Sequence, residues 1–214
     1  MSASATQIEI MAYLETNYLT IEQLSCQTDI PLSEIEAFIT NACIPMYSHK
    51  IVSQVTVSSQ IFGEITIGEQ ETFYYHPSLV AWALKAKDYA KQMNLCLVAR
   101  QMKEDFSSSL RQALMEIDIA HEAFPNCFTE RGELLEVGVQ AVLKKEWLNV
   151  MNGTYGICLK SITAESIVIK NSTVALLKKW LALTTDAGRK ESLTVTVQAL
   201  EAYDQVASLF GPHE

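Results

Sequence analysis

One short stretch of conformationally special residues lies between two long segments with helical apolar spacing, and it constrains the fold most. This stretch, residues 147–160, reads WLNVMNGTYGICLK. The pair Asn152-Gly153 tolerates positive φ, and such pairs end helices and form tight turns. Gly156 has no Cβ, so it lets the chain pass close to a neighbouring helix. We therefore expect a constrained junction between two helices, with Tyr155 held between two glycines.

The chain has 214 residues, which suffices for one large domain or two small ones. Apolar residues make up 49% of it and glycine and proline are few, which predicts a folded, helix-rich protein. No apolar run reaches the roughly 18–20 residues that span a bilayer. The N-terminal sequence MSASATQIEI lacks the basic start and apolar core of a secretion signal. We therefore expect a protein without a membrane span.

The cysteines are odd in number and widely scattered, which is typical of reduced thiols in a cytoplasm rather than of a disulfide framework. No C-x-x-C pair occurs, so a structural zinc site of the usual spacing is not expected. The five cysteines are Cys26, Cys43, Cys96, Cys127 and Cys158. The predicted location is cytoplasmic.

The net charge of −9 is unevenly distributed along the chain. Residues 1–84 contain nine acidic side chains and one basic side chain, Lys50. Residues 85–214 contain the remaining sixteen acidic and fifteen basic side chains and are almost neutral. The N-terminal part therefore carries nearly all of the negative charge.

The N-terminal pattern predicts three short helices. Residues 7–18 carry apolar side chains at helical spacing. Thr20 and Gln23 form a capping-box pattern at the start of a second helix, and Ser33 with Glu36 can cap a third. Two short helices around a tight turn, with another helix in front, are typical of a helix-turn-helix.

This stretch resembles the N-terminal helix-turn-helix of the MerR-type transcription regulators. A helix that reads DNA needs arginine or lysine to contact phosphates and base edges. Residues 31–43, at the position of the recognition helix, contain Glu34 and Glu36 and no basic residue. Phosphates would repel these carboxylates, and counterion release could not drive binding. We therefore interpret the helix-turn-helix as a fold element that does not bind nucleic acid.

Residues 51–75 alternate apolar and polar side chains, the pattern of two or three short antiparallel strands placed like the wing of a winged helix. From His76 onward the spacing is helical. It predicts five helices: about 79–94, 96–118, one capped by Thr129 up to Asn152, one from Thr163 to about 181, and one over 193–206. Short connections between them favour an antiparallel bundle. The expected fold is mainly α, with a winged-helix-like module at 1–75 and a helical bundle at 76–214.

Four pieces in order and spacing support a second resemblance that covers most of the chain. They are the early YLT-IEQL segment ending in IP, FYYHPSLVAWALKA, NGTYGICLK and the terminal LFGPHE. With these pieces the chain is similar to an uncharacterised bacterial family labelled with natural-product biosynthesis. The resemblance implies a biosynthetic setting, but the family has no established activity from which catalytic residues could be assigned to this chain.

Four residues are candidates for a site. Tyr155 either donates its hydroxyl to a ligand or packs between helices with the hydroxyl at the surface. His76, before Pro77, either acts chemically or bonds a nearby backbone group at a junction.

His121 follows Asp118 and precedes Glu122, a set that could bind a metal or form an acid–base site, or simply end a helix. Cys158 is either a nucleophile or an inert buried thiol.

Several common activities lack their motifs. There is no G-x-S-x-G, no Gly-rich phosphate loop and no dinucleotide fingerprint, so we expect no cofactor and no metal. The leading hypothesis is a non-enzymatic binding or regulatory protein whose bundle accommodates a small molecule or a protein partner. The alternative is an accessory biosynthetic enzyme using Tyr155 with His76 or His121, and a DNA-binding regulator ranks third.

The three tryptophans, Trp82, Trp147 and Trp180, fit a core or a subunit interface, and we expect a homodimer.

Overall fold

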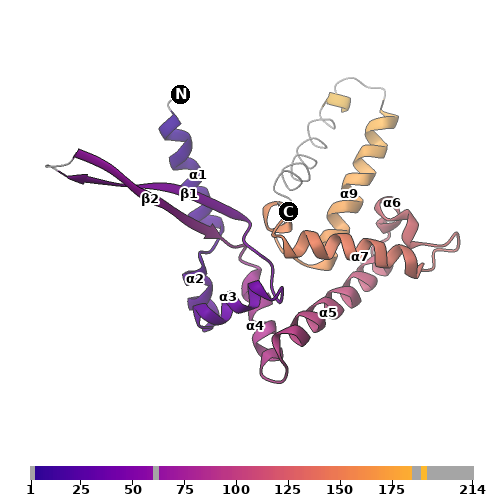
Figure 1. Cartoon of the computed structure of the whole chain (residues 1–214). Coiled ribbons are helices and arrows are strands. Elements are labelled where there is room, and N and C mark those ends of the chain that lie inside the picture. The colour runs from indigo at the N-terminus through magenta and orange to yellow at the C-terminus, as the bar shows by residue number, and fades with distance from the viewer. Residues whose placement is uncertain (1–2, 60–62, 185–188, 192–214) are drawn as a thin grey trace.

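The computed structural model describes residues 3–59, 63–184 and 189–191, with side chains for residues 9–56, 68–184 and 189–191. The described chain is mainly helical with one small antiparallel sheet, as the sequence predicts (Figure 1). Its elements are α1 (Ala3–Asn17), α2 (Ile21–Thr28), α3 (Leu32–Thr40), β1 (His49–Ser59), β2 (Gly63–Tyr74), α4 (Leu79–Ala90), α5 (Leu95–Glu116), α6 (Ala120–Ala123), the 3₁₀ helix η1 (Pro125–Cys127), α7 (Glu136–Met151), α8 (Tyr155–Cys158) and α9 (Ala164–Leu183).

Local capping signals account for the start of α2 but not for that of α3. The Thr20 hydroxyl accepts from the Gln23 backbone N–H at 3.4 Å, and the Gln23 side chain accepts from the Thr20 backbone N–H at 2.8 Å. This confirms the predicted capping box. The predicted cap at Ser33 and Glu36 is wrong, because α3 already begins after Pro31 and no side chain caps it. Pro31 has extended backbone angles and is itself the N-cap, so α3 starts at Leu32, two residues earlier than a Ser33 cap would allow.

The two strands form a long hairpin that projects away from the helices α4–α9 (Figure 1). A bulge interrupts the pairing between Val55 and Thr56. Leu19, between α1 and α2, exchanges two backbone hydrogen bonds with Tyr75 at 2.8 and 2.7 Å, which adds a single residue as a third strand. An isolated two-stranded hairpin is marginally stable in water. In this protein, the base of the hairpin packs on α1 through an apolar cluster made of Leu14, Tyr18, Ile51 and Tyr74. The order of elements is the one expected of a winged-helix-like module.

Four of the five helices predicted after His76 are found, as α4, α5, α7 and α9, and the short helices α6, η1 and α8 were not predicted. Asn94 caps the start of α5, where its side chain accepts from the Leu97 backbone N–H at 3.1 Å. Thr163 caps α9 as predicted. The predicted helix start at Thr129 is wrong, since α7 begins at Glu136. The Thr129 hydroxyl instead accepts from the backbone N–H groups of Arg131 and Glu133 at 3.3 and 3.1 Å, in a turn. The helix predicted over 193–206 lies outside the described residues.

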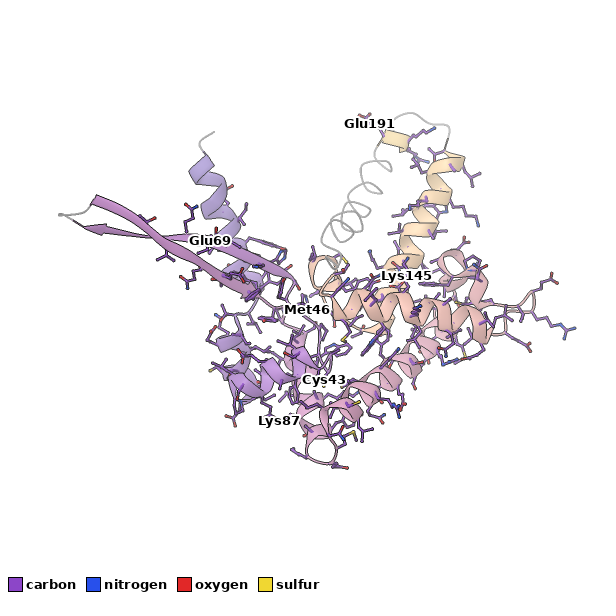
Figure 2. The ribbon with its side chains drawn as sticks, viewed as in Figure 1. Cys43, Met46, Glu69, Lys87, Lys145 and Glu191 are labelled. Carbon is purple, nitrogen blue, oxygen red and sulfur yellow. The ribbon has the colours of Figure 1, made fainter. Side chains whose placement is uncertain are left out.

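A single apolar core joins the two parts of the chain. It includes Leu24, Ile35 and Phe38 of the N-terminal helices together with α4, α5, α7 and α9. Helix α4 packs on α2 and α3, and α9 packs on α5 and α6. Figure 2 shows Met46 where the N-terminal part meets α7, and its backbone N–H donates to the Met151 carbonyl at 2.8 Å. Within the described part of the chain, no helix has the length and apolar character needed to cross a membrane.

Candidate functional site

The segment from Asn152 to Cys158 is a constrained junction, as the sequence predicts. Gly153 has φ +79°, which confirms the predicted positive φ. A Cβ at Gly153 would collide with the backbone carbonyl of Tyr47. Asn152 closes the turn, because its side-chain oxygen accepts from the Thr154 backbone N–H at 3.0 Å and from the Thr154 hydroxyl at 2.6 Å. Both the backbone angle and the surroundings therefore require glycine at position 153.

Gly156 also makes a close approach, but not to a helix. A Cβ there would collide with the Ser48 hydroxyl and lie 3.1 Å from the His76 Cβ. Ser48 precedes β1 and His76 precedes α4, so the predicted contact with a neighbouring helix is wrong. Helix α8 instead lies against the two connections that flank the hairpin. The Gly156 carbonyl accepts a hydrogen bond from the Tyr18 hydroxyl at 3.1 Å, which ties α8 to the N-terminal part.

Tyr155 is buried, with 3% of its surface exposed, so it packs between helices as the second of its two predicted roles has it, but its hydroxyl does not lie at the surface. The hydroxyl donates to the carboxylate of Glu146, which is 1% exposed. The amides of Asn149 and Asn171 donate to the same carboxylate at 3.3 and 3.5 Å. The ammonium of Lys170 lies 5.7 Å from the centre of the Tyr155 ring. This buried polar cluster joins α7, α8 and α9.

The environment of Tyr155 fixes its protonation state. Burial and the nearby Glu146 carboxylate raise the pKa of the phenol far above its usual value. The hydroxyl therefore remains a hydrogen-bond donor at neutral pH. A phenol committed in this way has a structural role, and Tyr155 does not line either cavity described below.

Glu146 is the residue that sequence reasoning missed. In the sequence, this helical segment is marked by the apolar residues Leu134, Leu135, Ala141, Val142 and Leu148. The structure buries a different stripe, which consists of Val139, Leu143, Glu146 and Val150. The spacing of three and four residues places Glu146 in the middle of that apolar face. A carboxylate in the middle of an apolar helix face is the sequence signal that could have predicted a buried polar cluster.

His76 is a buried junction residue bonded to the backbone, the second of its two predicted roles. Its Nδ1 accepts from the Ser78 backbone N–H at 3.1 Å. Burial lowers the pKa of its imidazole, while a backbone hydrogen bond with Leu159 acts in the opposite direction. The ring is therefore neutral at physiological pH, with its hydrogen bonds directed to the main chain.

His121 lies elsewhere, on the exposed side of α6. Its Nδ1 contacts the Asp118 carbonyl at 2.8 Å and its Nε2 lies 3.5 Å from the Glu122 carboxylate. Glu122 in turn pairs with Lys179 of α9 at 3.0 Å. These contacts link α6 to α9, and the structure does not bring His121 to Tyr155.

Cys158 and His76 do lie together, in a cavity of about 380 Å³ that we call the α8 pocket. The Cys158 thiol contacts the Thr154 carbonyl at 3.9 Å. The ring of Tyr18 lies edge-on to His49, with centroids 4.5 Å apart. The pocket is lined by Tyr13, Asn17, Tyr18, His76, Pro77, Gly156, Ile157, Cys158, Leu159 and Lys160.

A larger cavity of about 630 Å³ lies between α4, α5 and the start of α9, and we call it the α4–α5–α9 groove. Trp82 forms part of its wall, and its indole N–H donates to the Ile162 carbonyl at 3.2 Å. Trp147 supports this wall, with ring centroids 6.1 Å from Trp82 and 5.5 Å from Phe106. The lining comprises Ala81, Trp82, Lys85, Met102, Asp105, Phe106, Ser109, Gln112, Ala113, Glu116, Ile117, Ile162, Thr163, Ala164 and Glu165. These residues come from α4, α5, the start of α9 and the connections next to them, so no single sequence motif predicts the groove.

The charged groups of the groove fall into two kinds. Lys85 and Asp105 form an ion pair at 2.6 Å. The Tyr89 hydroxyl and the Gln101 amide also donate to Asp105, at 2.6 and 2.9 Å. Burial alone would raise the pKa of Asp105, but these hydrogen bonds outweigh it and hold the pKa below its usual value. The carboxylates of Glu116 and Glu165, by contrast, pair with no basic side chain in the described part of the chain.

Comparison with known proteins adds a family but no activity. The model of the family of unknown function DUF6058 matches residues 102–214, slightly more than half of the chain. No match was found among curated proteins or among solved structures. The matched region begins inside α5 and includes α7, the junction at α8 and α9. The chain therefore belongs to DUF6058, a family of unknown function.

Proposed function

We propose that this protein is a non-enzymatic binding or regulatory protein that holds a small molecule in the α4–α5–α9 groove. The observation that carries the proposal is the groove itself. Its volume of about 630 Å³ lies within the roughly 300–1,000 Å³ of ligand pockets in proteins. Eight of its fifteen lining residues are apolar and seven are polar or charged, so the groove can contact both an apolar and a polar part of a ligand.

The alternative of an accessory biosynthetic enzyme receives less support from the geometry. Its proposed acid–base groups are engaged elsewhere: Tyr155 with Glu146, His76 with the backbone, and His121 with Asp118 and Glu122. A pair of groups converging on one reacting atom would be needed for such chemistry. The link to natural-product biosynthesis remains a proposal that rests on the sequence resemblance.

We also propose the remaining organisation of the molecule. Residues 1–75 and 76–214 are two modules joined through one core, in a cytoplasmic protein. The exposed apolar side chains of α9 favour a homodimer, since Trp180 is 53% and Leu183 73% exposed.

The helix-turn-helix is not expected to bind DNA. Exposed carboxylates of Glu22, Asp29 and Glu36 lie on or beside α2 and α3, and no basic residue occurs before Lys50. Lys50 itself pairs with Glu71 on the hairpin. In a gel-shift assay at physiological salt, the protein should leave duplex DNA unshifted at micromolar concentrations. A salt-sensitive, sub-micromolar shift would contradict this prediction.

A matched pair of serine variants tests the groove. Ser109 and Ser108 are adjacent, exposed residues of α5, but only Ser109 lines the groove. Ser109→Trp should fill the groove and weaken binding of the probe 2-phenylethylamine about tenfold or more, whereas Ser108→Trp should leave it unchanged. Titration calorimetry on the full chain measures both. The proposal fails if the wild type binds neither this probe nor its neutral analogue 2-phenylethanol, or if the two variants bind equally well.

A further inference from the structure

We propose that the groove selects an organic cation, a small molecule with an apolar or aromatic body and a protonated amine. This inference rests on the proposed function of the α4–α5–α9 groove and specifies the class of ligand. It follows from the charges, the aromatic lining and the arrangement of the one basic side chain in the groove.

The charge balance of the lining favours a cation. Three carboxylates, Asp105, Glu116 and Glu165, line the groove together with one ammonium group, Lys85. Because Lys85 pairs with Asp105, those two charges offset each other. Glu116 and Glu165 remain, from the end of α5 and the start of α9. The Gln112 amide donates to Glu116 at 2.9 Å but supplies no charge. An ammonium group between these elements would supply the missing positive charge.

The aromatic lining suits the same ligand. Trp82 and Phe106 line the groove beside Met102, Ile117 and Ile162. Such walls favour an apolar body, and aromatic rings also attract a cation that approaches their faces. Glu116 and Glu165 are exposed, so a purely apolar ligand would gain nothing from their charges, and a carboxylate ligand would be repelled by them.

An anionic ligand would have to pair with Lys85, but Lys85 already pairs with Asp105. The Lys85 ammonium lies 2.6 Å from Asp105, whose other contacts come from Tyr89 and Gln101. Recruiting Lys85 to a ligand would separate this ion pair and leave Asp105 with fewer partners. Because Lys85 is engaged with Asp105, it does not favour the binding of an anion.

Three probes of similar size separate these possibilities: 2-phenylethylamine, 2-phenylethanol and 3-phenylpropionate. Titration calorimetry with the full chain at pH 7 should give the amine an affinity about tenfold higher than that of the alcohol, with the carboxylate weakest. Added salt should reduce this preference, because the carboxylates of Glu116 and Glu165 are exposed and salt screens them. In the double variant Glu116→Gln/Glu165→Gln, the amine should bind no better than the alcohol, while the affinity for the alcohol should stay unchanged.

The outcomes distinguish this inference from the proposed function. If none of the three probes binds, the groove is not a ligand site and both proposals fail. If the alcohol or the carboxylate binds as well as the amine, and Ser109→Trp still abolishes binding, the groove is a ligand site but selection of a cation is wrong. Retention of the amine preference in the double variant would also overturn the inference. Glu133→Gln/Glu130→Gln, which neutralises two exposed carboxylates outside the groove, serves as the control for net charge.

Discussion

Gly153→Ala is expected to destabilise the protein by about 2–5 kcal/mol, whereas Gly132→Ala should cost only about 1–2 kcal/mol. The two glycines have almost the same backbone angle, φ +79° and +80°. A Cβ therefore meets the same conformational penalty at both positions. At Gly132 it would enter open space, but at Gly153 it would collide with the backbone carbonyl of Tyr47. A carbonyl of the main chain cannot rotate away as a side chain can.

Urea unfolding of both variants measures their free energies of unfolding. The difference between the two losses reports the contact between the α7–α8 junction and the segment before β1. Gly153→Val adds a β-branched side chain at a positive φ and should cost more than alanine. Equal losses at positions 132 and 153 would show that the close approach to Tyr47 is absent, and the junction would lose its role in joining the two parts of the chain.

Tyr155→Phe should lower the free energy of unfolding by about 1–3 kcal/mol. The substitution keeps the buried ring, so it creates no large cavity, but it removes the hydroxyl that donates to Glu146. Glu146 would keep only the longer hydrogen bonds from Asn149 and Asn171. A buried carboxylate with too few donors is costly because it has also lost its water.

Tyr89→Phe is the matched control, since it too removes a phenol hydroxyl that donates to a carboxylate. Its acceptor, Asp105, is partly exposed and retains Lys85 and Gln101, so the loss should be below about 1 kcal/mol. In a Glu146→Gln background, Tyr155→Phe should cost less than in the wild type, with a coupling of about 0.5–3 kcal/mol. Probe affinity should not change in Tyr155→Phe, because Tyr155 does not line the groove. Unchanged stability, or weakened probe binding in a fully folded variant, would contradict the structural role.

Features that depend on a few neighbouring residues were predictable. The capping box at Thr20 and Gln23, the cap at Thr163 and the positive φ at Gly153 all involve groups within about four residues of each other. The same kind of signal failed at Thr129. A threonine there bonds the next backbone N–H groups whether a helix or a turn follows, and only the position of η1 and α7 decides between them.

Features that depend on packing were not predictable from local pattern. The hydrogen bond between the hydroxyl of Tyr155 and Glu146 depends on which face of α7 is buried, and the apolar pattern of the sequence did not single out Glu146. His76 and Cys158 share the α8 pocket although eighty-two positions separate them in the sequence. The groove requires Trp82, Asp105 and Glu165 from three elements, and Trp82 alone suggested only a core or an interface.

The indole N–H resonances of the three tryptophans test the central claim, the ligand-binding groove, most directly. Trp82 lines the groove, Trp147 packs behind it, and Trp180 lies exposed far along α9. During titration of the ¹⁵N-labelled full chain with 2-phenylethylamine, the Trp82 resonance should shift most, Trp147 less, and Trp180 should stay in place. A shift of Trp180 alone, or no shift of Trp82 at saturating probe, would contradict the assignment of the groove as the binding site.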